Sequence, residues 1–563
     1  MAQFAVAAAN PHATEAGYRI LKAGGSATDA AIAVQMVLSL VEPQSSGIGG
    51  GAFLLHFNGK DIEAFDGRET APAGADENLF LAADSKPITF MEAVVGGRSV
   101  GIPGTVRMLE VVHQRHGKLP WPQLFEPAIT LADEGFNVSA RLNALLQTEL
   151  HLKKDPIAAA YFYNTDGTPH ATGDRLRNPA LADILRKIAS GGSKALHEGV
   201  VAQSIVNKVN GHISNPGKLS MTDLADYRVK VRTPLCHDYQ AGKRDFLLCG
   251  FPPPSSGAIA IGQILGMLNH TDASALPFKN GQPTEQWLHL YTDASRLAFA
   301  DRAHFLGDPD FVNAPAGQWM SLLDPAYLAV RARLIDSRPK AMSLKTAQPG
   351  APGGENTSYA PMNEQPEYGT SHISIVDAEG HAVAMTSTIE DGFGSRLMVN
   401  VNPALAGGFL LNNELTDFSF LPKDASGTPV ANRVQAGKRP RSSMSPTLVF
   451  DKLTGALLVN TGSPGGAMII HYTAKTLYGI LNWGLSPQEA INLPNFGSLN
   501  GPTLLEEDRF SRATVDALNA RGHDVKEVIM TSGLQALAHD VPLLTPGWLG
   551  GADPRREGVV IGD

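Results

Sequence analysis

Apolar positions along the chain follow two spacings, one typical of packed helices and one typical of buried strands. Residues 14–22 and 27–40 are rich in Ala and carry apolar side chains at helical spacing. Residues 287–305 and 468–481 show the same period. The pattern predicts four core helices spread over the length of the chain.

Short apolar runs predict strands between these helices. Residues 52–57 (AFLLHF) are followed by Asn58-Gly59, a signal for a hairpin turn. Further strands are predicted at residues 370–377, 382–388, 408–411 and 447–450. There is no internal repeat, and the pattern alone indicates an α/β or α+β protein.

Composition and charge narrow the classes of partner. The chain has 43% apolar and 18% charged residues, as in ordinary globular proteins. A net charge of −9 without a basic run argues against nucleic acid or an anionic membrane as partner. The longest apolar stretch, residues 30–41, is interrupted by Gln35 and Ser39 and is too short to cross a bilayer. We expect no membrane insertion.

The cysteines and the metal-ligand types give no sign of a cofactor. Cys236 and Cys249 have no metal-ligand spacing and match no disulfide framework. We expect two small core residues, and the sequence leaves open whether they pair. No metal ion and no cofactor is expected.

The richest candidate chemistry lies at Gly369-Thr370-Ser371-His372, directly before an apolar run. A cut between Gly369 and Thr370 would make Thr370 a new N-terminus, with a hydroxyl nucleophile and an amine base in one residue. An α-amine has a reference pKa of about 7.7–8.0, close to working pH. These four residues alone are more typical of a Thr that merely opens a buried strand.

The residues before this position are rich in turn formers. Residues 347–354 read AQPGAPGG, and the composition of the whole stretch 346–369 departs from its surroundings. The stretch is either an ordinary connection or a segment that moves away once the chain is cut.

Beyond this stretch, the chain resembles the γ-glutamyltranspeptidases, which are N-terminal-nucleophile hydrolases. The matching motifs keep family order and lie at residues 8–31, 42–51 (EPQSSGIGGG), 66–72 (DGRETAP), 101–104, 252–257, 298–302, 370–377, 441–446 and 462–466. The resemblance implies an α+β protein with a four-layer αββα sandwich. It also implies one precursor that yields a large subunit, 1–369, and a small subunit, 370–563, which together form that single αββα unit.

The resemblance assigns catalytic roles. Thr370 is the expected nucleophile and Gly369–Thr370 the expected cleavage site. Thr388 matches the Thr that hydrogen-bonds the nucleophile. Gly465 and Gly466 match the oxyanion hole, where amide N–H groups without side chains stabilise a negative oxygen.

The resemblance also assigns the substrate contacts. Arg68, Ser442 and Ser443 match the positions that hold the α-carboxylate of a γ-glutamyl donor, a task suited to a guanidinium and hydroxyl groups. Glu414 and Asp417 match the pair that holds the α-ammonium.

The sequence departs from the family at two places. Glu390 stands where the family often has Asn, so three carboxylates would surround one ammonium and raise one another's pKa. Glu390 would then hold a proton, turn outward or bind a different donor. Residues 420–438 contain no Tyr or Trp, so we expect a short or poorly closing lid and a more open site.

Three functions follow in order of expectation. The first is an autoprocessed hydrolase/transferase that passes a γ-glutamyl group from glutathione-like amides to water or an amine. The second is a cephalosporin acylase of the glutaryl type, and the third an uncleaved, inactive binding protein. Family members are usually exported, yet no signal peptide is visible at Met1. A periplasmic or secreted location is expected, with the cytoplasm as alternative.

Overall fold

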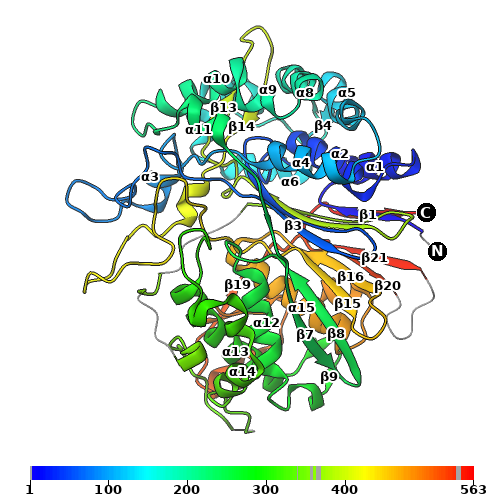
Figure 1. Cartoon of the computed structure of the whole chain (residues 1–563), viewed down its shortest axis with the longest axis vertical. Helices are drawn as coiled ribbons and strands as arrows, with labels where there is room; N and C mark the ends of the chain where they lie inside the picture. Colours follow the sequence, from blue (N-terminus) through cyan, green and yellow to red (C-terminus); the bar gives the residue numbers. More distant parts are fainter. Residues whose placement is uncertain (1–2, 339, 355–358, 363–368, 540–546) are drawn as a thin grey trace.

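Two antiparallel sheets face each other at the centre of the molecule, and helices cover their outer faces (Figure 1). The computed structural model describes residues 3–338, 340–354, 359–362, 369–539 and 547–563. The first sheet has seven strands in the order β22-β1-β11-β12-β2-β3-β6. Its strands are β1 (Ala5–Ala8), β2 (Gly51–Phe57), β3 (Ile62–Gly67), β6 (Lys230–Arg232), β11 (Ser371–Val376), β12 (Ala382–Thr388) and β22 (Val559–Gly562).

The second sheet has six strands in the order β21-β20-β16-β15-β8-β7. Its strands are β7 (Leu235–Ala241), β8 (Arg244–Gly250), β15 (Thr447–Asp451), β16 (Leu457–Gly462), β20 (Gln535–His539) and β21 (Trp548–Ala552). Smaller sheets contain β4 (Phe136–Asn137), β5 (Arg175–Leu176), β9 (Phe278–Lys279), β10 (Gln282–Pro283), β13 (Met398–Val399), β14 (Phe409–Leu410), β17 (Phe496–Gly497), β18 (Thr503–Glu506) and β19 (Val525–Val528).

Helices form an outer layer on each side of the paired sheets (Figure 1). On the side of the first sheet lie α1 (Pro11–Lys22), α2 (Ala27–Val41), α3 (Phe90–Val94), α4 (Thr105–His116), α5 (Glu126–Glu134), α6 (Ala140–Thr148), α7 (Pro156–Phe162), α8 (Pro179–Gly191), α9 (Lys194–His197), α10 (Gly199–Asn210) and α11 (Met221–Asp226). On the side of the second sheet lie α12 (Gly257–Leu268), α13 (Glu285–Phe305), α14 (Pro325–Ala332), α15 (Ile469–Leu481), α16 (Pro487–Asn492) and α17 (Arg512–Ala520).

Side-chain alternation along the strands builds the layers. In β2, Phe53 and Leu55 pack toward the second sheet, where they meet Phe251 and Leu448. Leu54 points to the other face and packs with α1 and α2. A third core joins the second sheet to α12, α13 and α15. The predicted four-layer αββα sandwich is therefore confirmed.

The elements predicted from the apolar pattern are also present, with small shifts at their ends. The predicted helix at 14–22 extends back to Pro11, which follows the side-chain cap of Asn10. The helix at 27–40 begins after a capping box formed by Ser26 and Asp29. The strand predicted from Thr370 begins at Ser371 instead, because the backbone of Thr370 is not extended.

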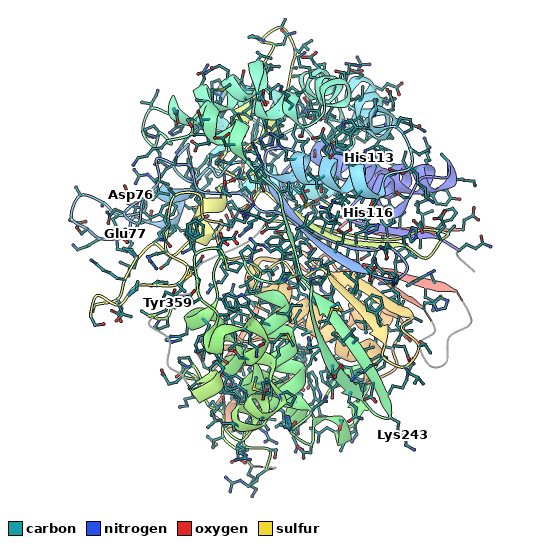
Figure 2. The ribbon with its side chains drawn as sticks, in the orientation of Figure 1. Asp76, Glu77, His113, His116, Lys243 and Tyr359 are labelled. Atoms are coloured by element: carbon teal, nitrogen blue, oxygen red, sulfur yellow. A yellow bond between two sulfur atoms is a disulfide. The ribbon has the colours of Figure 1, made fainter. Side chains whose placement is uncertain are left out.

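The two cysteines are paired, which answers the question that the sequence left open. Cys236 and Cys249 form a disulfide between β7 and β8. The register of this hairpin places the two residues directly opposite each other. Its turn, Gly242-Lys243, lies at the outer edge of the molecule (Figure 2). Of the two expected core residues, Cys249 is fully buried and Cys236 half-buried, and the sequence left their pairing open because pairing depends on hairpin register.

The stretch 346–369 is described only in part, since residues 355–358 and 363–368 lie outside the described residues. The described portions are docked. The Gly350 N–H donates to Asp301 Oδ1 at 2.8 Å, and the Met362 N–H donates to the Ala303 carbonyl at 2.9 Å. Separately, none of the helices in the described ranges combines the length and the apolar character needed to cross a membrane.

Candidate active site

Thr370 lies directly before β11, with 5% of its surface exposed. Its hydroxyl donates to Thr388 Oγ1 at 3.0 Å, and Thr388 is the last residue of the neighbouring strand β12. Its backbone N–H donates to the Ser45 carbonyl at 2.9 Å. The pairing of β11 with β12 thus holds the hydroxyl of the predicted nucleophile in one orientation.

The peptide between Gly369 and Thr370 is held in a strained form. Thr370 has φ +96°, an uncommon value that costs a β-branched residue conformational energy. The Gly369 N–H donates to the Glu390 carbonyl oxygen at 2.5 Å. A Cβ at position 369 would overlap that oxygen, so only Gly fits there. The strain lies where the sequence predicts a cut.

One small cavity gathers most of the predicted site. It is lined by Arg68, Thr370, Thr388, Glu390, Glu414, Asp417, Ser442, Ser443, Met444, Gly466 and Ile469. Of the predicted residues, only Gly465 and Gly369 lie outside this lining, and each is next in sequence to a lining residue. The volume is about 20 Å³, room for about one water molecule. The uncut chain therefore does not have the open site expected from its lid segment.

The lid segment turns inward in this structure. Phe420 stacks on Phe80 with ring centroids 4.4 Å apart, and both rings belong to a buried cluster with Leu415 and Phe418. The absence of Tyr and Trp from 420–438 therefore does not leave this segment loose, because Phe420 supplies the apolar contact at its start.

Arg68 follows β3 and is fully buried. Its Nη1 pairs with Glu414 and its Nη2 with Asp417. Its Nε donates to the Pro440 carbonyl at 3.1 Å and its Nη2 to the Arg441 carbonyl at 2.8 Å. Glu414 and Asp417, which are predicted to hold the donor ammonium, thus neutralise Arg68, which is predicted to hold the donor carboxylate. Four of its five N–H groups already have protein acceptors.

Three carboxyl groups present unpaired oxygens in the cavity. Glu390 Oε1, Glu414 Oε2 and Asp417 Oδ1 are buried, and none has a hydrogen-bond partner among the described residues. Burial is the main cause that raises the pKa of all three, and mutual repulsion adds to it. The pKa of Asp417 rises to about 7. These raised pKa values mean that the group of acids takes up a proton more readily than free carboxyl groups do, and that an entering cation would favour the ionised forms.

The side chain of Glu390 does not face away. Its Oε2 accepts hydrogen bonds from Asn413 Nδ2 and, at 3.3 Å, from Thr416 Oγ1. Its backbone N–H donates to Thr388 Oγ1 at 2.8 Å, which ties it to the residue that holds Thr370. Of the three alternatives drawn from the sequence, the outward one is wrong.

Gly465 and Gly466 lie at the start of the helical segment that runs into α15. Their φ angles, +130° and +58°, favour glycine, and a Cβ at Gly465 would crowd the Tyr472 ring. Neither amide N–H donates to another group in the described part of the chain. These amides are therefore available to an oxyanion at the cavity that Gly466 lines.

Ser442 and Ser443 line the same cavity as the three carboxyl groups. The Ser443 hydroxyl accepts a bond of 2.6 Å from Arg302 Nη2, and the Ser442 hydroxyl accepts one of 3.1 Å from the Met444 N–H. Because both oxygens already accept bonds, each hydroxyl hydrogen remains to be donated to a ligand.

Several neighbours of the site were not predicted. The family motifs include Ser45, Glu69 and Asn413. The sequence therefore marked these positions but assigned them no function. Burial raises the pKa of Glu69 to about 7, beside Arg68 and Glu414. Met444 and Ile469 line the cavity without polar chemistry; Met444 lies inside the motif at 441–446 and Ile469 inside the predicted helix 468–481, but neither was given a role.

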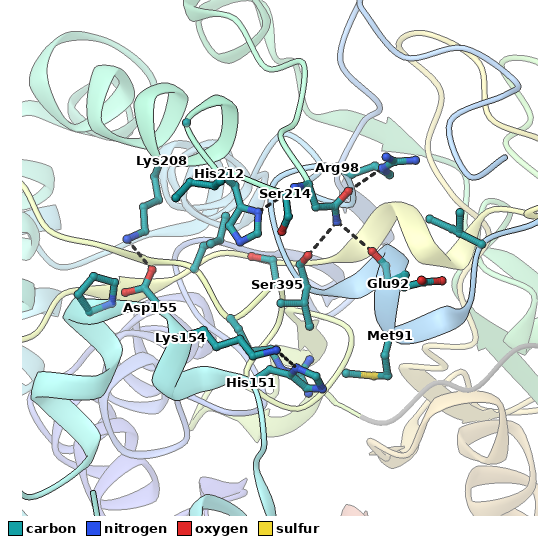
Figure 3. A pocket seen from close by; sticks show the side chains of 18 of the residues that line it. Met91, Glu92, Arg98, His151, Lys154, Asp155, Lys208, His212, Ser214 and Ser395 are labelled. Atoms are coloured by element: carbon teal, nitrogen blue, oxygen red, sulfur yellow. Dashed lines mark hydrogen bonds and ion pairs between the residues drawn. The ribbon is translucent and has the colours of Figure 1, made fainter. Parts of the chain in front are cut away.

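A much larger cavity lies elsewhere. A cleft of about 820 Å³ opens between α3, α7, α10 and residues 395–397 (Figure 3). Its walls carry Arg98, Lys154 and Lys208, the last paired with Asp155. It contains neither Thr370 nor any other predicted site residue, so its size does not make it the catalytic site.

Two groups of side chains have the spacing of metal ligands. His56, Glu63 and His116 form one, near the end of α4 (Figure 2). The rings of His56 and His116 are stacked, which does not let both aim at one ion. His289, Asp293 and His523 form the other, but His289 Nδ1 lies 2.9 Å from His523 Nε2 in a hydrogen bond. Neither geometry suits a metal as it stands.

Sequence comparison gives the relationship. The family described as Gamma-glutamyltranspeptidase matches residues 13–563. This chain belongs to the γ-glutamyltranspeptidase family. It is 35% identical to the glutathione hydrolase proenzyme of Bacillus subtilis (strain 168), over 99% of this chain and 91% of the relative. It is also 35% identical to that of Escherichia coli (strain K12), over 92% and 85%.

Solved structures extend the relationship of this γ-glutamyltranspeptidase family member. Cephalosporin acylase from Bacillus halodurans superposes with a TM-score of 0.82 at 25% identity, covering 100% of this chain and 96% of that one. γ-Glutamyltranspeptidase from Helicobacter pylori gives 0.54 at 32% identity over 58% and 90%. The family and fold are thus shown, and two donor classes occur among the names of its relatives.

Proposed function

We propose that this chain cuts itself at Gly369–Thr370 and then acts as a γ-glutamyl hydrolase/transferase on glutathione-like amides. The observation that carries the proposal is the cavity itself. It joins a strained, hydrogen-bonded Thr370 to an arginine, two serines and three unpaired carboxyl oxygens. Relatives named as glutathione hydrolase proenzymes support the same conclusion.

Self-cleavage would use the Thr370 hydroxyl. Its Oγ attacks the Gly369 carbonyl carbon, the C–N bond breaks, and the Thr370 nitrogen takes the hydroxyl proton. Water then hydrolyses the resulting ester between Gly369 and Thr370. The reaction releases the strain at φ +96°, and it leaves the amine donating to the Ser45 carbonyl.

Acyl transfer would follow from the same residue. The free Thr370 amine accepts the hydroxyl proton while Oγ attacks the γ-carbonyl of the donor. The N–H groups of Gly465 and Gly466 stabilise the oxyanion, and the proton passes to the leaving amine. Water or an acceptor amine then takes the acyl group from Thr370.

The unpaired oxygens favour a γ-glutamyl donor over a glutaryl one. A primary ammonium has three N–H donors, and Glu390, Glu414 and Asp417 offer three buried acceptors without partners. A glutaryl group lacks that ammonium and would leave all three unsatisfied, at a cost of about 1–3 kcal/mol each. The fold match to a cephalosporin acylase keeps a glutaryl-type donor as the second candidate.

The location belongs to the proposal as well. We propose a periplasmic or secreted enzyme, and the Cys236–Cys249 disulfide supports this because disulfides persist in oxidising compartments.

Purified protein tests the function directly. On a denaturing gel two fragments should appear, and N-terminal sequencing of the smaller should start at Thr370. A γ-glutamyl anilide should then be hydrolysed at least tenfold faster than a glutaryl anilide. A single uncut chain would remove the mechanism, and faster glutaryl cleavage would establish the second candidate.

Glu390→Gln is expected to raise the KM for a γ-glutamyl anilide about tenfold, since one charged hydrogen bond is lost. In wild type the raised pKa of Glu390 favours its protonated form, and the donor ammonium favours the ionised form. Affinity should therefore be full above the raised pKa of the pocket acids and fall as the pH drops below it. Gln cannot titrate, so the slope of KM against pH should become shallower.

The glutaryl anilide provides the comparison for this variant. It has no ammonium to lose, so its KM should stay constant or fall. Glu69→Gln serves as matched control, because Glu69 is a buried neighbour of Arg68 that does not line the cavity. Glu69→Gln should change the KM values of the two anilides by the same factor. An equal effect of Glu390→Gln on both donors would show that Glu390 does not contact the ammonium.

Gly369→Ala is expected to block self-cleavage, because the added Cβ overlaps the Glu390 carbonyl and displaces the scissile peptide. The uncut fraction after a day at 25 °C, read from a gel, is the measurement. Gly392→Ala is the control, since a Cβ there has no neighbour within 4 Å. Normal processing of Gly369→Ala would show that the close approach is not needed.

A further inference from the structure

Arg556 contacts Thr370 but does not line the cavity. It comes from the loop between β21 and β22, close to the C-terminus, and is 8% exposed. Its Nη1 donates to the Thr370 carbonyl oxygen at 3.1 Å. Its Nε donates to the Thr531 carbonyl at 3.1 Å, which fixes the plane of the guanidinium. No motif in the sequence marked this residue.

We propose that Arg556 is a positioning residue for the nucleophile, which orients Thr370 through its carbonyl and keeps the amine created by cleavage in its neutral, basic form. The inference rests on the proposed function, because it concerns the amine that exists only after the cut. A neutral amine is required, since an ammonium has no lone pair to accept the hydroxyl proton.

The position of the Arg556 guanidinium allows its positive charge to act on the Thr370 amine. The guanidinium is within hydrogen-bond distance of the carbonyl of the same residue whose nitrogen is the base. A cation at that range disfavours a second positive charge, and burial leaves little water between them. Burial also lowers the pKa of Arg556, to about 10, but the side chain still carries its charge at neutral pH.

Other titratable and charged groups lie near Arg556 and Thr370 and also influence the protonation of the Thr370 amine. The groups that interact electrostatically with Arg556 are Arg141, Glu42, Asp553 and Tyr472; Glu557 interacts with Glu42. On the cavity side lie Arg68, Glu69, Glu390, Glu414 and Asp417.

Glu42 is the carboxyl group that most directly opposes Arg556. It accepts a bond of 3.2 Å from the Ser45 hydroxyl, and the Ser45 carbonyl accepts the Thr370 N–H at 2.9 Å. Burial raises the pKa of Glu42 to about 7. When ionised it would favour an ammonium on Thr370, the opposite of Arg556.

The test is the pH dependence of kcat for a γ-glutamyl anilide. In the enzyme–substrate complex the donor ammonium holds the cavity carboxylates ionised, so the acid limb of kcat reports the Thr370 amine. Arg556→Gln should move that limb to higher pH by about one unit, and Arg556→Lys should restore it to near the wild-type position. Arg555→Gln is the matched control, because Arg555 pairs with Glu506 and Asp553 and does not contact Thr370.

A second variant decides the case if Arg556→Gln fails to fold or stays uncut. Glu42→Gln removes the opposing carboxyl group, so its limb should move to lower pH by about half a unit. Three results overturn the proposal. The first is that Arg556→Gln lowers kcat without moving the acid limb of its pH profile, and the second is that Arg556→Lys shifts this limb as far as Arg556→Gln does. The third is that Glu42→Gln leaves the acid limb where it is or moves it to higher pH. An inactive, uncut wild type would remove the proposed function, and this inference with it. The three results above leave that function standing.

Discussion

Thr370→Ala is expected to remain one uncut chain with no measurable acyl transfer. The variant loses the hydroxyl that donates to Thr388, and no amine base is released because the attack on Gly369 cannot begin. Loss of both nucleophile and base should lower kcat by at least about 10⁴-fold, as in other enzymes with activated hydroxyl nucleophiles. A gel and an anilide assay measure the two effects separately.

Thr370→Ser is the matched variant, since it keeps the hydroxyl and the hydrogen bond to Thr388. It should still be cut, more slowly or at a similar rate, and keep part of its activity. Two fragments in Thr370→Ala with the N-terminus at position 370 would mean that another group performs the cleavage, and the mechanism would have to be abandoned.

Arg68→Lys is expected to weaken donor binding by about 1.5–3 kcal/mol, seen as a tenfold to hundredfold increase in KM. A lysine keeps the positive charge but has three donors, too few to hold Glu414, Asp417 and the two carbonyl groups and also reach a donor carboxylate. Stability should fall as well, because buried carboxylates lose partners.

Processing separates the two roles of Arg68. Self-cleavage uses no donor, so Arg68→Lys should still give two fragments, which the gel would show. Thermal unfolding of the cut variant should report the lost stability. An unchanged KM for the γ-glutamyl anilide would mean that the donor carboxylate is held by Ser442 and Ser443 alone.

The sequence was informative where local pattern and motif agree. Strand periodicity placed Thr370 and Thr388 at the ends of two predicted strands, because it is a local property of the chain, whereas the catalytic roles of Thr370, Thr388 and Gly466 came from the family resemblance. The pairing of Arg68 with Glu414 and Asp417 could not, since it joins residues 346 and 349 positions apart. The family roles predicted what these groups would bind, and the empty cavity shows that they first bind one another.

Three-dimensional packing decided the remaining points. The inward turn of the lid segment depends on Phe420 meeting Phe80, and the disulfide depends on the register of β7 with β8. The contact of Arg556 with Thr370 crosses 186 positions and requires the chain to pass from β21 in the second sheet back to β22 in the first. Such long-range contacts leave no trace in the spacing of apolar residues.

The order of the strands has a consequence for the cut protein. In the first sheet, β1 lies between β22 and β11, and β12 pairs with β2, while β15 pairs with β8 in the second. A cut at Gly369–Thr370 would therefore turn four of these ladders into contacts between separate polypeptides. The product would be an interwoven heterodimer whose halves cannot part without dismantling both sheets. Its refolding would become a second-order process that depends on protein concentration. The cut protein would then persist because it unfolds slowly, and no longer because it folds reversibly.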